Sequence, residues 1–225
     1  MKTNRHRGMK TMVVMILLAG VITVLKADAP APKKGNVTLK SLTSITFNKD
    51  GILFLADPLG THLYAIETQG ATQPDPDKIT VPNIDEKVAA LLGVQVKDIK
   101  IVDMAVHPIS KEIYLAVTRN GSPAQSVLIK CDHKGNLRAV ALNDVSFYET
   151  SITDVPAPGT KLPQQWHTLT MAVTDMAFVD GELFVSGLSG EQFSSKMRRF
   201  AFPFTNQSQA VQLEIFHTSH DIYET

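Results

Sequence analysis

The sequence predicts an all-β protein, a β-propeller with about three four-stranded blades and one short helical insertion. Three observations predict it. Three segments share one internal pattern, turn residues punctuate short strand-like runs, and the 225 residues are 44% hydrophobic, enough for a sizeable core. The 13 glycines and 12 prolines are ordinary in number, which excludes a collagen-like, low-complexity or wholly disordered chain.

The shared pattern is a predicted β-hairpin. It occurs in LTSITFNKDGILFLAD, IVDMAVHPISKEIYLAV and VTDMAFVDGELFVSG. Each segment has an alternating apolar run, a polar or glycine-containing turn, and a second apolar run, which together are typical of a hairpin. Ser44, Asp103 and Asp175 take the same place in the three repeats, 59 and then 72 residues apart.

Two further strands are expected after each hairpin. Candidates for the third strand are residues 62–66, 125–131 and 196–201, and candidates for the fourth are residues 78–81, 136–142 and 210–216. The predicted blades therefore span about residues 41–82, 99–142 and 171–216, within a domain of residues 36–225. Four-stranded repeats at such intervals are typical of a propeller. A β-sandwich is the alternative, but it would lack the repeated internal order.

Two insertions separate the predicted blades. A short helix is predicted over about residues 84–92, because Asn83 is a suitable N-cap, Gly93 a suitable end, and Ile84 and Val88 begin one apolar stripe. Residues 142–169 are polar and contain three prolines, so we expect a long loop that is either functional or disordered.

Three blades are too few to close a ring, since propellers have about four to eight. We therefore expect residues 36–225 to be the N-terminal part of a longer propeller. The alternative is a protomer that completes its ring with copies of itself. Residues 35–40 are expected to form a strand of a missing last blade.

Residues 1–29 predict a secretory signal peptide and a short linker. A basic head precedes fourteen uncharged residues, 12–25, which as a helix would span about 21 Å, short of a roughly 30 Å hydrocarbon core. Ala27 is the expected cleavage point. The predicted location is therefore the periplasm or the extracellular side of the envelope, and the alternative is an uncleaved N-terminal membrane anchor.

Charge and cysteine content narrow the range of partners. Lys+Arg and Asp+Glu are balanced at 22 each, and removal of residues 1–29 leaves a mildly acidic domain. Such a domain is expected to bind neither nucleic acid nor, after signal cleavage, a membrane surface. Cys131 is the only cysteine, so no internal disulfide can form, and the fold depends on packing.

Three longer segments carry a resemblance to known proteins: LFLADPLGTHLYAIE, AALLGVQVKDIKIVDMAVHPISKEIYLAVTR and VTDMAFVDGELFVSGLSGEQFSSKMRRFAFPF. They resemble exported bacterial β-propeller proteins of the quinoprotein-like or YVTN-like type, and are especially similar to an uncharacterised planctomycete-type group. The resemblance covers most of residues 40–220. It implies a propeller fold and export, and it brings no assigned catalytic residues. Typical members are longer than this chain.

Candidate ligand-binding residues lie on the loops expected to meet at one end of the propeller, where this fold usually binds ligands. Arg119 is suited to hold a carboxylate, and Trp166 to stack on a sugar or an aromatic group. Each candidate has a plainer interpretation as a turn residue or a solvated loop residue. The full set is Asp57, Arg119, Asn120, Trp166, His167 and Glu191.

No motif predicts catalysis, a metal or a cofactor. His217, His220 and Asp221 lie close together in sequence, but nothing indicates that they share a helix face, so exposed loop side chains are preferred over a metal site. The aspartates of the repeats lack calcium-loop spacing, and we expect Asp103 and Asp175 to bond neighbouring backbone or a strand turn instead. There is no nucleophile elbow and no glycine-rich phosphate loop.

We therefore expect an exported binding or interaction module, without a cofactor, for an unknown small molecule, polysaccharide or envelope protein. The alternative is a propeller hydrolase or quinoprotein-type enzyme whose site needs blades outside this chain. A structural protein of the cell surface is a third possibility.

Overall fold

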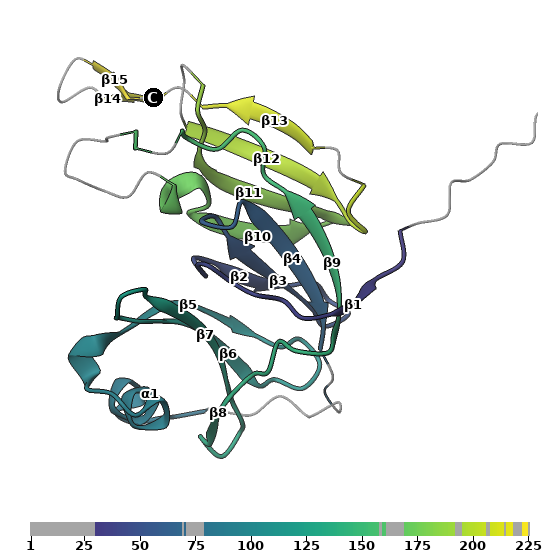
Figure 1. Ribbon diagram of the computed structural model, residues 1–225. Coiled ribbons are helices and arrows are strands. Elements are labelled where there is room, and N and C mark those ends of the chain that lie inside the picture. The colour runs from purple at the N-terminus through teal and green to yellow at the C-terminus, as the bar shows by residue number, and fades with distance from the viewer. Residues whose placement is uncertain are drawn as a thin grey trace, which may run out of the picture.

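The computed structural model describes residues 30–68, 70, 79–157, 159–160, 169–191, 195–205, 208–213, 215–217 and 222–224. In these ranges the structure is mostly β, arranged as three larger antiparallel sheets and a separate hairpin (Figure 1). The predicted signal peptide, residues 1–29, lies outside the described residues. Within the described ranges, no helix has the length and apolar character needed to cross a membrane.

The sheets are named in chain order. The first contains β1 (Lys33–Gly35), β9 (Val145–Ser151), β4 (His62–Glu67), β3 (Ile52–Asp57) and β2 (Ile45–Phe47), in that spatial order. The second contains β5 (Ile99–Val106), β6 (Ile113–Arg119), β7 (Gln125–Cys131) and β8 (Leu137–Ala139). The third contains β10 (Asp175–Val179), β11 (Glu182–Leu188), β12 (Ser195–Ala201) and β13 (Ser208–Gln212). β14 (Ile215–His217) and β15 (Ile222–Glu224) pair only with each other.

The three predicted hairpins are confirmed. β2 pairs with β3, β5 with β6 and β10 with β11, each antiparallel. The turn between β10 and β11 uses Asp180 (φ 49°) and Gly181 (φ 85°), the left-handed conformations that a two-residue turn between twisted strands needs. In the β2–β3 turn, the Asn48 Oδ1 atom accepts hydrogen bonds from the Asp50 and Ile52 amides.

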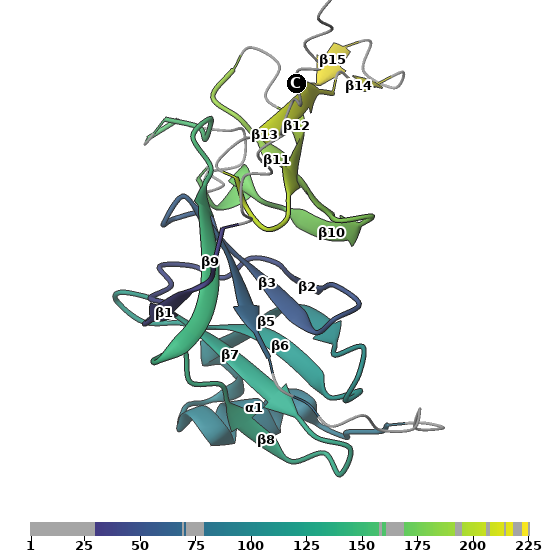
Figure 2. The same cartoon turned by 90° about the vertical axis from the view of Figure 1, so that its right-hand side faces the viewer.

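The first sheet is the middle layer of a three-sheet stack (Figure 2). Leu53 and Leu55 on one face pack against the second sheet, and Phe54 and Ala56 on the other face pack against the third. All four side chains are fully buried, which explains why β3 is continuously apolar rather than alternating. The spatial order is therefore second, first, third.

The fourth strand of the first sheet corrects the sequence prediction. It is β9, which pairs with β4 from His62–Ser151 to Ile66–Phe147, whereas residues 79–81 form no strand. β9 has apolar side chains on both faces, Phe147 toward the second sheet and Tyr148 toward the third, so it suits the middle layer. In sequence, the whole second sheet therefore lies between β4 and β9, the third and fourth strands of the first sheet. The segment 142–169, expected to be a loop, contains the strand β9.

Two other predicted strands also lie elsewhere. The N-terminal strand is β1, at 33–35 rather than 35–40, and it pairs with β9 in the first sheet rather than belonging to a missing last blade. The fourth strand of the third sheet ends at Gln212, because residues 215–217 belong to the β14–β15 hairpin.

The predicted helix is present as α1 (Ile84–Leu92) and ends at Gly93, whose φ of 66° is the left-handed conformation typical of a helix C-terminus. Asn83 does not cap the backbone with its side chain, which donates to the Glu86 carboxylate instead. Val88 is fully buried against the outer face of the second sheet, formed there by Leu115, Val117 and Ile129. α1 therefore covers one end of the stack.

Candidate functional site

A cavity of about 510 Å³, named here the loop-end cavity, opens beside the β3–β4 and β6–β7 loops. The segments that lead into β2 and β10 line it, together with the first residues of β5, the β3–β4 loop, and the ends of β6 and β7 with the loop between them. Of the loops predicted to carry ligand-binding residues, the β3–β4 and β6–β7 loops contribute to this lining, whereas residues 187–195 do not. The cavity lining includes Lys40, Leu42, Lys100, Thr118, Asn120, Ser126, Met171 and Val173.

The cavity has an apolar floor and a polar rim. Leu42 and Val173 in the floor are each 1% exposed. Threonine and serine hydroxyls, the Asn120 amide and two lysines surround the floor, and no carboxylate from the described part of the chain lines the cavity. Neither Lys40 nor Lys100 forms an ion pair with a described residue. The described part of the rim therefore carries two lysines without an ion pair beside hydrogen-bonding groups.

Asp57, a predicted binding residue, supports the cavity wall instead of facing a ligand. Its side chain is 1% exposed, and it accepts hydrogen bonds from the Lys40 amide (3.0 Å), the Ser41 amide (2.8 Å) and the Gly60 amide (3.0 Å). The Ser41 hydroxyl donates to the same carboxylate (2.8 Å) and accepts from the Leu59 amide (3.0 Å). Asp57 thereby fixes the segment that carries Lys40.

Arg119 is the last residue of β6 and Asn120 follows it, but only Asn120 lines the cavity. The Asn120 amide N–H donates to the Asp98 carbonyl (2.7 Å), and its side chain donates to the Lys97 carbonyl (3.3 Å). The Arg119 guanidinium makes a long contact of 3.5 Å with Gln125 on the paired strand. The predicted carboxylate clamp at Arg119 is thus not a lining group of this cavity.

Glu191 belongs to an ionic cluster on the third sheet. Its carboxylate contacts the Lys196 ammonium at 2.6 Å, and this hydrogen bond lowers the pKa of Glu191. Lys196 also contacts Asp154 (2.7 Å), whose other oxygen accepts from the Arg198 guanidinium (2.7 Å). Burial opposes ionisation of Asp154, but the hydrogen bonds from Lys196 and Arg198 outweigh it and lower the pKa of that carboxyl.

Arg198 connects this cluster to the cavity. It is 1% exposed and donates to the Ala172 carbonyl (3.2 Å) and the Leu188 carbonyl (2.8 Å). Ala172 is flanked by Met171 and Val173, which line the cavity. Sequence reasoning missed Arg198, Lys40 and Lys100, because two residues within strands and one in a segment before a strand carry no motif that marks them.

Trp166 and His167 lie outside the described residues, as do His220 and Asp221. Among the residues that the structure does describe, no three histidine, cysteine, aspartate or glutamate side chains are grouped to hold a metal ion.

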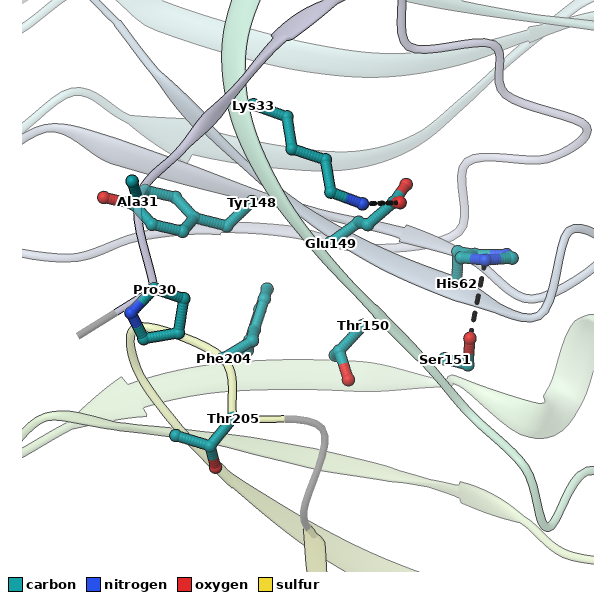
Figure 3. Close-up of a pocket in the computed structure, with 10 residues that line it drawn as sticks. All are labelled: Pro30, Ala31, Lys33, His62, Tyr148, Glu149, Thr150, Ser151, Phe204 and Thr205. Carbon is teal, nitrogen blue, oxygen red and sulfur yellow. Dashed lines mark hydrogen bonds and ion pairs between the residues drawn. The ribbon is translucent and has the colours of Figure 1, made fainter. Parts of the chain in front are cut away.

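A second pocket, of about 340 Å³, lies beside β9 (Figure 3). There the Lys33 ammonium pairs with Glu149 (2.6 Å), and Ser151 Oγ lies 3.5 Å from His62 Nε2. A nucleophile and its base normally approach to about 2.6–3.2 Å. The Ser151–His62 contact is longer and exposed, so this pocket is a weaker candidate than the loop-end cavity.

No protein-family model matches the chain, and no curated protein matches it. Among solved structures, it is similar to hydrazine synthase of Kuenenia stuttgartiensis, at 10% sequence identity and a TM-score of 0.24. The match covers 80% of this chain and 51% of that one, so the chain spans about half the length of that protein. A TM-score this low does not establish a shared fold or activity.

Proposed function

We propose that the chain is an exported binding module of the β-propeller type and that its ligand occupies the loop-end cavity. The cavity carries this proposal: segments from all three sheets meet there around an apolar floor, and its volume of about 510 Å³ is typical of small-ligand sites. The sheets contribute rigid walls, and Asp57 and Arg198 hold two of the lining segments in place. The basic head and the uncharged residues 12–25 that follow it support export through a signal peptide.

The lining chemistry favours an acidic oligosaccharide among the possible ligands. Hydroxyl and amide side chains such as Thr118, Asn120 and Ser126 match the hydroxyl groups of a sugar, and the apolar floor matches the C–H face of its ring. Lys40 and Lys100 supply positive charge that no described residue neutralises, which suits a carboxylate or sulfate on the ligand.

A glycan array with uronic-acid, sulfated and neutral oligosaccharides tests this function. We expect binding to acidic glycans, weakened about tenfold by the double variant Lys40→Ala/Lys100→Ala, since an exposed ionic contact is worth about 0.2–1 kcal/mol. The matched control is Lys34→Ala/Lys49→Ala, which removes two exposed lysines from surface ion pairs away from the cavity lining. Equal weakening by both double variants, or no preference for acidic glycans, would contradict the proposal.

The enzymatic alternative, a propeller hydrolase or quinoprotein-type protein, has less support. Its most suggestive feature in the described part of the chain is the Ser151–His62 contact of 3.5 Å. His62 Nδ1 is hydrogen-bonded to the Gly60 carbonyl (2.5 Å), which orients the ring but supplies no negative charge to a base. Binding is therefore the function that the geometry supports best.

A further inference from the structure

The strand registers identify equivalent positions in the three sheets. They show that the same face of each sheet points in the same direction along the stack. In the second sheet, Tyr114 pairs with Ala105 and with Lys130. In the third sheet, Phe184 pairs in the same way with Ala177 and Arg199. In the first sheet, Phe54 takes this position, between Thr46 and Ala65. A neighbouring row on the same face holds Ala116–Leu128, Ala56–Leu63 and Ser186–Met197.

Two of these three equivalent faces are covered by the next sheet. Tyr114 (3% exposed) and Leu128 (1%) of the second sheet pack on the first, and Phe54 and Leu63 (both 0%) of the first pack on the third. The third sheet turns its equivalent face away from the stack, because Leu183 and Val185 take up the opposite face. Met197 and Val211 on that outer face are 38% and 59% exposed.

An ion pair repeats at the same positions with different burial. Lys130 pairs with Glu112 on the covered face (2.7 Å), and Arg199 pairs with Glu182 on the outer face (3.3 Å). The covered side chains are 8% and 15% exposed, against 42% and 33% for the outer pair. The outer face of the third sheet thus carries the same ion pair and apolar positions as the covered faces, but no described residues cover it.

Asp103 and Asp175, which take the same place in two repeats, show which hydrogen bonds a neighbouring sheet donates. Asp103 Oδ1 accepts from the Met104 amide (2.7 Å), and Oδ2 accepts from the Ile45 amide (2.8 Å) and the Ser44 hydroxyl (3.0 Å) of the next sheet. Asp175 Oδ1 accepts from the Met176 amide in the same way (2.7 Å), but no described residue donates to its Oδ2.

We propose that the outer face of the third sheet binds a fourth antiparallel sheet of the same repeat, carried by the same polypeptide. The first strand of that sheet donates a backbone N–H and a hydroxyl to Asp175, and an aliphatic face covers the rest of the surface. The docking face consists of Asp175, Ala177, Phe184, Ser186, Met197, Arg199 and Val211.

Two observations favour the same polypeptide over a second copy as the source. A second copy docking in the repeat direction would have to present the receiving face of its second sheet, and α1 covers that face with the fully buried Val88. The chain also runs from β13 into the β14–β15 hairpin within a few residues, and each of the three sheets has an antiparallel hairpin of consecutive strands at one edge.

Hydrogen-peroxide oxidation of the full polypeptide made from its natural gene, read by peptide mass spectrometry, tests this proposal. The variant Lys49→Met supplies an exposed reporter, because the Lys49 side chain is 88% exposed, and Met176 (6%) is the buried reference. We expect Met197 to oxidise at least about tenfold more slowly than the reporter, at every protein concentration and with a monomeric mass by light scattering. Oxidation at the reporter's rate overturns the docking face.

Protection that is lost on dilution, together with a doubled mass, overturns the same-polypeptide source in favour of a second copy. A further variant tests the hydrogen bond: Asp175→Ala is expected to speed Met197 oxidation severalfold, whereas the exposed turn variant Asp50→Ala leaves it unchanged. Equal rates in both variants overturn the role of Asp175. None of these measurements depends on the glycan site.

Discussion

Asp154 balances the buried cations of the third sheet. Arg198 is 1% exposed, and its ionic partner is the Asp154 carboxylate. Removal of one partner of a buried ion pair is costly because the remaining charge stays buried without compensation. The cluster matters for function too, because Arg198 also donates to the Ala172 carbonyl in the segment that lines the cavity.

Asp154→Asn should therefore destabilise the protein at pH 7 by about 2–4 kcal/mol. The folded state holds the pKa of Asp154 below its ordinary value of 3.8, so the stability from this group is complete above that pH and is lost as the pH falls through the folded-state value. Urea unfolding between pH 7 and pH 2 should show the two proteins converging in acid. The control is Asp144→Asn, an exposed aspartate paired with Lys34 at 3.4 Å, which should stay within about 0.5 kcal/mol. A wild-type to Asp154→Asn difference that does not change with pH would contradict this account.

At the scale of the elements, the hairpins and α1 were predictable because their information is local. Neighbouring residues alone determine the Asp180–Gly181 turn and the end of α1 at Gly93. β9 was not predictable in the same way, because its partner β4 ends at Glu67, more than 70 residues earlier, with a complete sheet between them. Residues 78–81 were an adequate strand by composition, and only the long-range pairing excludes them.

The candidate site, too, has features that neighbouring residues predict and features that depend on long-range contacts. The repeats predicted ligand-binding residues on the β3–β4 and β6–β7 loops, and Asn120 of the second loop lines the cavity. The supporting role of Asp57 depends on hydrogen bonds to Lys40 and Ser41, which lie 17 and 16 residues earlier. Lys40 and Lys100 become neighbours of one cavity only when two sheets pack together, a relation that neither segment shows alone.

α1 gives a prediction at this scale. Val88→Ala should cost about 1–3 kcal/mol, because it removes two buried methyl groups between the helix and the outer face of the second sheet. Leu91→Ala on the same helix should cost less than about 0.5 kcal/mol, since Leu91 is 41% exposed. The free energy of unfolding in urea measures both. Equal costs would show that α1 does not cover the sheet through Val88.

At the scale of the whole molecule, the aromatic position shared by the three sheets tests the stacking order itself. Phe54 stacks on Phe178 (5.0 Å between ring centroids) and meets Phe202 edge-on (5.1 Å), so it joins the first sheet to the third. Tyr114 is equally enclosed between the second and first sheets, where burial raises its pKa to about 12. Phe184 has the same place in the third sheet but lies on the outer face, opposite Leu183 and Val185.

In the 225-residue chain, Phe54→Ala should therefore destabilise by about 3–5 kcal/mol, whereas Phe184→Ala should cost less than about 1.5 kcal/mol. The two substitutions remove the same side chain from the same position of the repeat, so the difference measures coverage by a neighbouring sheet rather than strand propensity. Urea unfolding followed by far-UV circular dichroism gives both values. Similar losses at the two positions would mean that the sheets do not stack in the order second, first, third, because only that order covers Phe54 and leaves Phe184 at the end.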